Sequence, residues 1–157
     1  MNNIRFIEWL EAQVMACDVC GTVYDMAGEQ SPYVEGAKCG RSVCLDGTYK
    51  SISPFLLPSV TMLNRHSPVV EDSQIEVCNP SWVEISLTFK DAYGNHFTGP
   101  PAGFEFDIDP NSMKHNADTP IKLERRIDIR GKSDLGLYEA IQDAILNLYT
   151  WAKDGYR

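Results

Sequence analysis

The sequence predicts an α+β protein: an antiparallel β-sheet or meander closed by a long C-terminal helix, with an N-terminal helix and a small four-cysteine lobe. Three observations support this class. Apolar and polar residues alternate along residues 82–90 and again along 121–130, as they do in half-buried strands. Apolar residues recur at helical spacing after Ser133. Two closely spaced cysteine pairs lie between residues 17 and 44.

The length and charge of the chain restrict what it can be. Its 157 residues, of which 43% are hydrophobic, suit one globular domain that carries a small lobe. We expect residues 1–50 to form the N-terminal helix and the cysteine lobe, and residues 51–157 to form the sheet and the C-terminal helix, in one compact unit. The formal net charge of −8 disfavours nucleic acid as a partner, because phosphate backbones repel an acidic surface.

The N-terminal segment and the cysteine count predict the compartment. Glu8 and Glu11 interrupt the first apolar stretch, so we expect no secretory signal peptide. No apolar run approaches the length of about 18 residues that a membrane span needs. The cysteines number five, an odd count. We therefore expect the reducing cytoplasm, where close cysteine pairs bind metal or do redox chemistry more often than they form structural disulfides.

The elements before residue 70 are predicted from spacing and from proline. Residues 3–16 should form an amphipathic helix, because apolar side chains recur there at helical spacing: Phe6, Ile7, Leu10 and Val14. The apolar segment 52–63 contains Pro54 and Pro58, which argue against a helix or a central strand. We therefore expect an extended segment that packs the cysteine lobe on the rest of the protein.

The second half of the chain predicts a meander and a terminal helix. Along 82–90, the residues Val83, Ile85, Leu87 and Phe89 should face the core, and Glu84, Ser86, Thr88 and Lys90 the solvent. Gly94-Asn95 should form a turn, and residues 104–109 and 121–130 two further strands, with Arg125 as the misfit on an apolar face. A helix should begin after the N-cap Ser133 and stop at Gly155. Its apolar stripe comprises Leu137, Ile141, Ala144, Ile145, Leu148 and Trp151.

The strongest chemical signal is the cysteine pattern C-x2-C-x18-C-x4-C, formed by Cys17, Cys20, Cys39 and Cys44. Each short-spaced pair can wrap one edge of a metal ion, and Gly21 and Gly40 give the backbone room to do so. Four thiolates in a tetrahedron suit zinc, or less commonly a single iron. Unrelated thiols or a redox disulfide are the alternatives. The fifth cysteine, Cys78, is most simply a small buried hydrophobe.

The stretch "CDVCGTVYD" resembles the first knuckle of rubredoxins, in which C-x2-C-G precedes a short aromatic strand. That resemblance implies an iron–thiolate electron carrier. It covers nine residues and departs from the family at the second pair, "CGRSVC", where rubredoxins repeat the C-x2-C-G knuckle. Zinc ribbons use the same turn, so the resemblance implies a shared knuckle geometry. A site closed by four thiolates leaves no position for water and is therefore structural.

Two enzymatic readings remain open. Glu105, Asp107 and Asp109 alternate on one strand face and can hold Mg²⁺ for chemistry on phosphorylated or nucleic-acid substrates, although a solvated strand face shows the same alternation. Cys78 with His66 or His96 is an imaginable thiol hydrolase, but no neighbouring feature activates this cysteine. The chain has no P-loop, dinucleotide fingerprint, G-x-S-x-G or H-E-x-x-H motif.

The leading hypothesis from the sequence is a non-enzymatic interaction protein, such as an adaptor, an inhibitor or a regulatory subunit. The expected partner is another protein, with a homo-oligomer possible through the same residues. Aromatic and arginine side chains are the usual anchors of protein interfaces. The candidates for this role are Trp82, Tyr93, Arg126 and Arg130. Salt bridges within the sheet face are the simpler explanation of the two arginines.

Overall fold

A computed structural model of the protein describes residues 4–26, 34–44, 47–65, 69–78, 81–90, 99–107 and 121–155. Several expected features lie outside these residues: Tyr93, the Gly94-Asn95 turn, Asp109 and the three histidines, His66, His96 and His115. The described part confirms an α+β protein with antiparallel sheets, a C-terminal helix and a cysteine-containing lobe.

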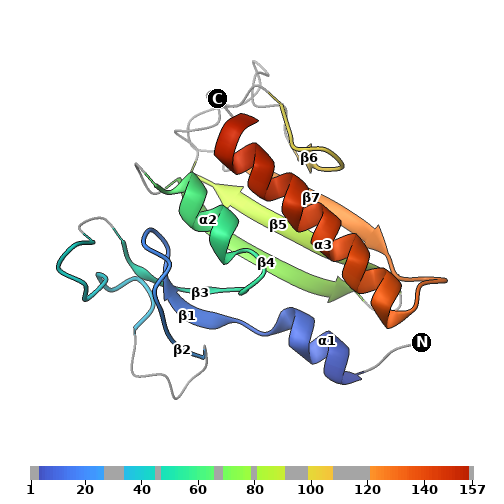
Figure 1. Ribbon diagram of the computed structural model, residues 1–157, viewed down its shortest axis with the longest axis horizontal. Coiled ribbons are helices and arrows are strands. Elements are labelled where there is room, and N and C mark those ends of the chain that lie inside the picture. Colours follow the sequence, from blue (N-terminus) through green and yellow to red (C-terminus); the bar gives the residue numbers. More distant parts are fainter. Residues whose placement is uncertain are drawn as a thin grey trace.

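The chain folds into two antiparallel sheets and the helices packed beside them (Figure 1). The elements are α1 (Ile4–Glu11), β1 (Val14–Cys17), β2 (Val23–Met26), β3 (Tyr49–Ile52), α2 (Leu57–Leu63), β4 (Val70–Cys78), β5 (Trp82–Phe89), β6 (Glu105–Phe106), β7 (Ile121–Asp128), α3 (Asp134–Thr150) and a π-helical turn, Trp151–Gly155. The small sheet has the strand order β2-β1-β3, and the large sheet has the order β4-β5-β7-β6.

The core lies between the large sheet and the helices α2 and α3, which cover one face of that sheet (Figure 1). The predicted apolar face of β5 is confirmed, because Val83, Ile85, Leu87 and Phe89 are all fully buried. The predicted stripe of α3 is also confirmed, with Leu137, Ile141, Ala144, Leu148 and Trp151 buried. Among the helices in the described part of the chain, none is long and apolar enough to cross a membrane.

The two ends of α3 are set by specific hydrogen bonds. Ser133 caps the helix as predicted, because its side chain accepts a hydrogen bond from the Gly136 N–H at 3.0 Å. Trp151 lies in the π-helical turn at the other end, where its indole N–H donates to the carbonyl of Gly99 at 2.7 Å. Its ring meets Phe89 of β5 edge-on at 6.3 Å. The last turn of the helix is therefore fastened to the sheet below it.

Among the described residues, no helix covers the other face of the large sheet, which is polar, but the expectation that all its β5 side chains are solvated was wrong. Glu84 and Ser86 are only 8% and 3% exposed. Long side chains on β7 cover them, because Lys122 and Arg126 form ion pairs with Glu84 at 2.9 and 3.4 Å. Lys122 also forms an ion pair with Glu124 at 3.5 Å, so a network of ion pairs covers this face.

The strands at the far edge are shorter than the alternation predicted. β6 covers only Glu105–Phe106, and β7 ends at Asp128. Arg125, the misfit on the apolar face of β7, is half-buried and lies under the turn at Gly103. A Cβ at that glycine would stand 2.7 Å from a guanidinium nitrogen of Arg125, so the guanidinium would have to move, and the positive φ of 82° itself favours glycine.

The N-terminal helix is shorter than predicted: α1 ends at Glu11, and residues 14–17 form the central strand of the small sheet. All four residues of β1 are buried. Leu10 in α1 and Val14 in β1 are both buried and are four residues apart. This spacing matches a helical period by coincidence, although the helix has already ended. Such a short apolar run cannot be assigned from its period alone.

The prediction of an extended segment at residues 52–63 was also wrong, because Leu57–Leu63 forms α2. Pro58 lies in the first turn of this helix, where a residue needs no N–H donor. Ser53 prepares the turn before it: its carbonyl accepts from the N–H groups of Leu56 and Leu57. Its hydroxyl accepts from the N–H of Phe55 at 3.2 Å. Proline here starts a helix instead of preventing one.

The outer edge of β4 is protected by two charged side chains. The carboxylate of Glu11, at the end of α1, accepts a hydrogen bond from the Val77 N–H at 3.1 Å. Lys50 of β3 donates to the carbonyl of Glu71 at 2.6 Å. Both contacts occupy backbone groups that an edge strand would otherwise offer to another chain. They also join the N-terminal part of the protein to the large sheet.

A buried asparagine makes a second polar connection between the cysteine lobe and the rest of the fold. Asn64 is fully buried at the end of α2. Its amide nitrogen donates to the carbonyl of Asp18, in the first cysteine turn, at 2.8 Å. Its amide oxygen accepts from the N–H groups of Val69 and Val70, where β4 begins, at 2.8 and 2.9 Å. One side chain thus satisfies three buried backbone groups from two separate segments.

Replacing this asparagine should destabilise the protein strongly. Asn64→Ala leaves three buried backbone groups without partners, so we expect the free energy of unfolding to fall by about 3 kcal/mol or more. Chemical denaturation measures this change. Ser59→Ala is the matched control, since the fully buried Ser59 hydroxyl has no hydrogen-bond partner and alanine favours a helix. A loss below about 1 kcal/mol for Asn64→Ala would contradict the role given to its side chain.

Candidate metal centre

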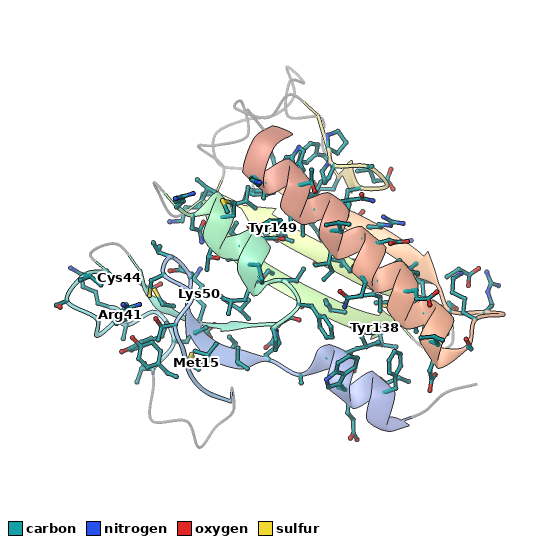
Figure 2. All side chains as sticks on the ribbon, in the orientation of Figure 1. Met15, Arg41, Cys44, Lys50, Tyr138 and Tyr149 are labelled. Atoms are coloured by element: carbon teal, nitrogen blue, oxygen red, sulfur yellow. The ribbon has the colours of Figure 1, made fainter. Side chains whose placement is uncertain are left out.

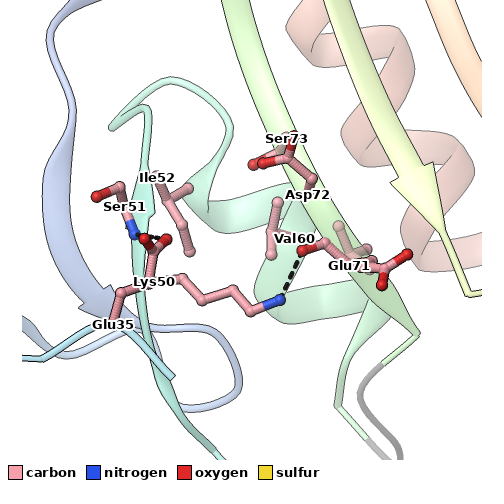
Figure 3. A pocket seen from close by; sticks show the side chains of 9 residues that line it. Glu35, Lys50, Ser51, Ile52, Val60, Glu71, Asp72 and Ser73 are labelled. Carbon is pink, nitrogen blue, oxygen red and sulfur yellow. Dashed lines mark hydrogen bonds between the residues drawn. The ribbon is translucent and has the colours of Figure 1, made fainter. Parts of the chain in front are cut away.

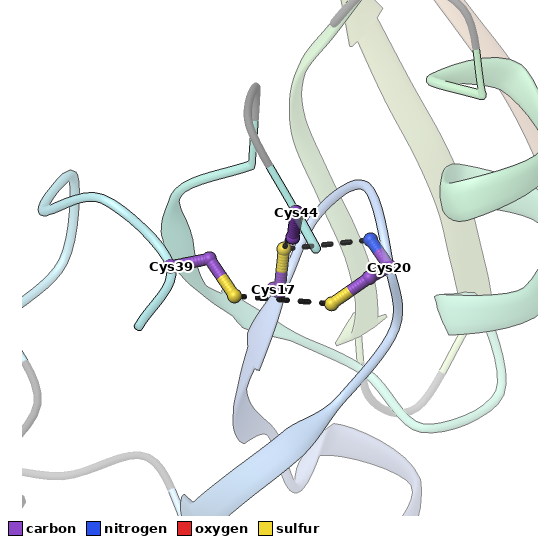
Figure 4. Close-up of side chains that lie close together, drawn as sticks. All are labelled: Cys17, Cys20, Cys39 and Cys44. Atoms are coloured by element: carbon purple, nitrogen blue, oxygen red, sulfur yellow. Dashed lines mark hydrogen bonds between the residues drawn. The ribbon is translucent and has the colours of Figure 1, made fainter. Parts of the chain in front are cut away.

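The four cysteines of the predicted pattern meet at one point of the lobe (Figure 4). Their sulfur atoms all lie within 4.8 Å of one another. Cys17 Sγ is 3.6 Å from Cys44 Sγ, and Cys20 Sγ is 3.8 Å from Cys39 Sγ. A metal ion with bonds of about 2.3 Å to four tetrahedral sulfurs would hold them about 3.8 Å apart. All four are free thiols at this spacing, and the cluster can hold a metal ion.

The first cysteine pair lies on the turn between β1 and β2. The N–H groups of Val19 and Cys20 both point at Cys17 Sγ, each at 3.4 Å. Gly21 follows with a positive φ of 76°, a conformation that costs other residues energy, and its N–H donates to the Cys17 carbonyl at 3.1 Å. The turn therefore aims backbone donors at a sulfur, which stabilises that sulfur as a thiolate.

The second pair lies on the segment that leads into β3. Cys39 is held by its N–H, which donates to the carbonyl of Gly47 at 2.9 Å, and Cys44 by a turn to the carbonyl of Arg41 at 3.0 Å. Gly47 is buried beside the sulfurs. A Cβ at this position would stand 2.2 Å from Cys17 Sγ and 2.8 Å from Cys44 Sγ. The close approach of the two cysteine segments therefore requires glycine here.

A buried aspartate ties the two cysteine segments together. Asp18, 2% exposed, lies between the cysteines of the first pair. Its carboxylate accepts from the Thr48 N–H at 2.9 Å and lies 3.4 Å from the Thr48 hydroxyl. Its own N–H donates to the Thr48 carbonyl at 3.1 Å. These bonds hold the segment after Cys44 beside the first cysteine turn. Asp18 does this through hydrogen bonds and is not one of the four candidate metal ligands.

Hydroxyl groups and one cation surround the sulfurs. The Tyr24 hydroxyl is 3.2 Å from Cys39 Sγ, and the Thr22 hydroxyl is 3.2 Å from Cys20 Sγ. The guanidinium of Arg41 donates to the Thr22 hydroxyl oxygen at 3.0 Å. Tyr49 stacks edge-on with Tyr24 and accepts from the Gly40 N–H at 3.0 Å. Four thiolates around a divalent cation carry excess negative charge, which these donors offset.

The acidities of the thiols differ with their surroundings. Burial raises the pKa of Cys17 and of Cys44 above the ordinary value of a thiol. Burial also acts to raise the pKa of Cys20, but hydrogen bonds to the Thr22 side chain and backbone, and to Cys17 and Cys39, lower it to about 6. The hydrogen bond to Cys39 raises the pKa of Tyr24, so this hydroxyl stays a proton donor.

The acidic strand face does not form a comparable centre. Glu105 and Asp107 are both exposed. Asp107 directly follows β6, and its carboxylate accepts a hydrogen bond from the backbone N–H of Lys122 in β7 at 2.9 Å. Within the described residues, the four cysteines are the one group of three or more ligand-type side chains close enough to share an ion. Asp109 lies outside the described residues.

A small pocket between β3 and β4 does not provide a substrate site either. Lys50 crosses it to reach Glu71, and Glu35 closes one side by accepting from the Ser51 N–H (Figure 3). Its cavity volume is about 10 Å³. That volume holds about one water molecule.

Of the candidate partner-binding residues, Trp82 and Arg126 lie on the helix-free face of the large sheet, and Tyr93 lies outside the described residues. Trp82 is half-buried beneath Arg126, whose guanidinium carbon is 4.8 Å from the ring centroid. Arg130 is exposed and pairs with Asp128 at 3.2 Å. Cys78 faces Trp82 across the β4–β5 pair and is half-buried, so the expectation of a buried Cys78 was wrong.

Sequence reasoning missed most of the support around the cysteines. Gly47 is the clearest omission, because its need for glycine arises from sulfurs three and thirty positions away. Asp18 and Asn64 act through backbone partners distant in sequence and leave no local pattern. The sequence did contain a hint of the roles of Thr22 and Tyr24. Both residues closely follow the first cysteine pair, and their hydroxyl groups stand at alternate positions of a predicted strand.

Comparison with known proteins gives no match to any family model, to any curated protein or to any solved structure.

Filling the space beside the sulfurs should remove the metal site. In Gly47→Ala the new methyl group overlaps Cys17 Sγ, so we expect binding of added Zn²⁺ to weaken by about tenfold or more. Competition with a chromophoric chelator measures the affinity. Gly99→Ala is the control, since a Cβ there meets nothing within 4 Å. Equal affinities for the two variants would refute the close approach of Gly47 to the sulfurs.

Metal binding should release protons and weaken in acid. Because burial raises the pKa of Cys17 and Cys44, both thiols are protonated at pH 7 without metal, and a binding cation displaces about two protons from them. Falling pH favours the protonated thiols, so the affinity for Zn²⁺ should fall with it. Calorimetry at pH 7 in two buffers of different ionisation enthalpy counts the protons. Proton release near zero, or an affinity unchanged towards acid pH, would contradict the prediction.

Proposed function

We propose that this protein is a zinc-stabilised, non-catalytic module of the reducing cytoplasm that binds another protein. The observation that carries the proposal is the closed set of four thiols, with sulfur spacings of 3.6 and 3.8 Å across the two cysteine pairs. Four thiolates fill a tetrahedral zinc ion, which leaves no position for a water nucleophile. Such a site stabilises a fold and does not catalyse hydrolysis.

The lobe has the properties expected of a domain that needs a metal ion. Its strands have only four residues each, and a sheet of that size provides little apolar surface. Two of its buried residues are the ligands Cys17 and Cys39 themselves. The free energy of zinc binding would therefore supply stability that packing alone does not provide.

The surface that best suits a protein partner is the helix-free face of the large sheet. It carries Trp82 and Arg126, residue types enriched at the energetic centres of interfaces. The Arg126 side chain is 60% exposed, whereas the Glu84 side chain that it pairs with is 11% exposed. The arginine can therefore turn towards a partner carboxylate while Lys122 keeps Glu84 neutralised.

Reversing the charge of this arginine should remove the partner. We expect proteins that co-purify with the tagged native chain from its own cytoplasm to be lost with Arg126→Glu. Lys153→Glu is the matched control, because Lys153 is an exposed cation on the terminal helical turn and not on this face. Quantitative mass spectrometry of the captured proteins compares the three. Partners that survive Arg126→Glu, or are lost equally with Lys153→Glu, would contradict the assignment of this face.

Iron is the second candidate for the site, because four thiolates with backbone N–H donors suit it as well. Two backbone N–H groups at 3.4 Å from Cys17 Sγ are the kind of donors that tune the potential of an iron–thiolate centre. Visible absorption separates the two metals: a zinc protein is colourless, and an iron–thiolate protein is red and bleaches on reduction.

A further inference from the structure

We propose that the four-cysteine centre is a peroxide-sensitive switch that oxidises across its two knuckles, first joining Cys20 to Cys39 and then Cys17 to Cys44. The inference rests on the proposed zinc site and adds its regulation. It differs from the expected behaviour of C-x2-C motifs, whose two cysteines commonly pair with each other. The geometry points to the cross-knuckle pairs.

Two sulfur–sulfur contacts connect the two knuckles. Cys20 Sγ and Cys39 Sγ are 3.8 Å apart, and Cys17 Sγ and Cys44 Sγ are 3.6 Å apart. In each pair one sulfur belongs to the first knuckle and the other to the second. The two pairs use all four ligands, so both disulfides can form in the same molecule (Figure 4).

Exposure and hydrogen bonding select Cys20 as the first sulfur to react. Cys17 is fully buried, and Cys39 is 8% exposed, whereas Cys20 is half-buried at the lobe surface. Its sulfur contacts the Thr22 hydroxyl, which receives a hydrogen bond from Arg41. The hydroxyl oxygen thus accepts from the guanidinium, and its proton is free to point at the sulfur or at an incoming oxygen.

Arg41 gives this edge of the centre its positive charge. Its side chain is exposed to solvent and lies near Cys44 in the lobe (Figure 2). A cation and a hydroxyl donor beside a thiolate stabilise the hydroxide that leaves when peroxide is cleaved. Cys44 is also half-buried but lies beside the Gly47 backbone, where a Cβ would be 2.8 Å from its sulfur.

The oxidant is hydrogen peroxide. The Cys20 thiolate attacks one peroxide oxygen, the O–O bond breaks, and hydroxide leaves with the electron pair, so that Cys20 becomes a sulfenic acid. The Cys39 thiolate then attacks the Cys20 sulfur and displaces a second hydroxide. Two thiolates have lost two electrons, and one peroxide has become two waters after taking up two protons. A second peroxide joins Cys17 to Cys44 by the same steps.

The first disulfide removes two of the four zinc ligands. The remaining pair, Cys17 and Cys44, provides only half of a tetrahedral site, so zinc leaves. The lobe then depends on covalent links and on the contacts of Asp18 and Asn64. A dithiol reductant with added zinc reverses both steps and restores the centre.

The test treats the purified, zinc-loaded protein with hydrogen peroxide and follows zinc release with a chromophoric indicator. Peptide mapping without reduction identifies the disulfides at successive times. Cys78→Ser serves as background, since this cysteine lies outside the centre. We expect Cys20–Cys39 to appear with zinc release, Cys17–Cys44 to follow, and dithiothreitol with zinc to restore the starting state. Disulfides within one knuckle, or sulfinic acids without disulfides, would overturn the proposal.

A pair of charge-matched variants tests the choice of Cys20. Arg41→Gln should slow peroxide-driven zinc release by about fivefold, because a donor to the Thr22 hydroxyl is lost, whereas Lys38→Gln removes an equally exposed cation and should not. Release to a chelator without peroxide should be the same in both. Equal peroxide rates would overturn the role of Arg41. A protein that contains no zinc before treatment refutes the proposed function itself, so the two failures are distinguishable.

Discussion

The N-terminal lobe depends on one constraint: four sulfur atoms are held within 4.8 Å of one another. Four thiolates at that distance repel one another strongly unless a cation lies between them. Without the cation, burial favours the protonated forms of Cys17 and Cys44, whereas hydrogen bonds keep the pKa of Cys20 low, at about 6. In the zinc-bound state that we propose, the metal would hold the lobe together, and a metal-free lobe would have little to replace that interaction.

Polar contacts carry this constraint to the rest of the fold. Asp18 binds the strand after the second cysteine pair, and its carbonyl is held by Asn64, which also anchors the first residues of β4. Lys50 adds a contact from the lobe to the edge of the same strand. Since β4 is an edge strand of the large sheet, these contacts connect the lobe to the border of the core.

The sequence predicted the parts of this protein in which one local period decides the structure. Strand 82–89 and helix 134–150 follow from alternation and helical spacing, and the convergence of the four cysteines follows from their spacing. Prediction failed where a local rule has two outcomes. Pro58 starts a helix as readily as it prevents one, and Val14 continues a helical period while it belongs to a strand. Gly47 and Asn64 could not be found, because their roles depend on contacts between distant segments.

The most direct measurement is the metal content of the purified protein, combined with its thermal unfolding before and after treatment with a strong chelator. A structural zinc site predicts about one zinc per chain, no visible colour, and a melting temperature that falls when the metal is removed. A metal-free protein that unfolds at the same temperature with and without chelator would contradict the central role of the four cysteines.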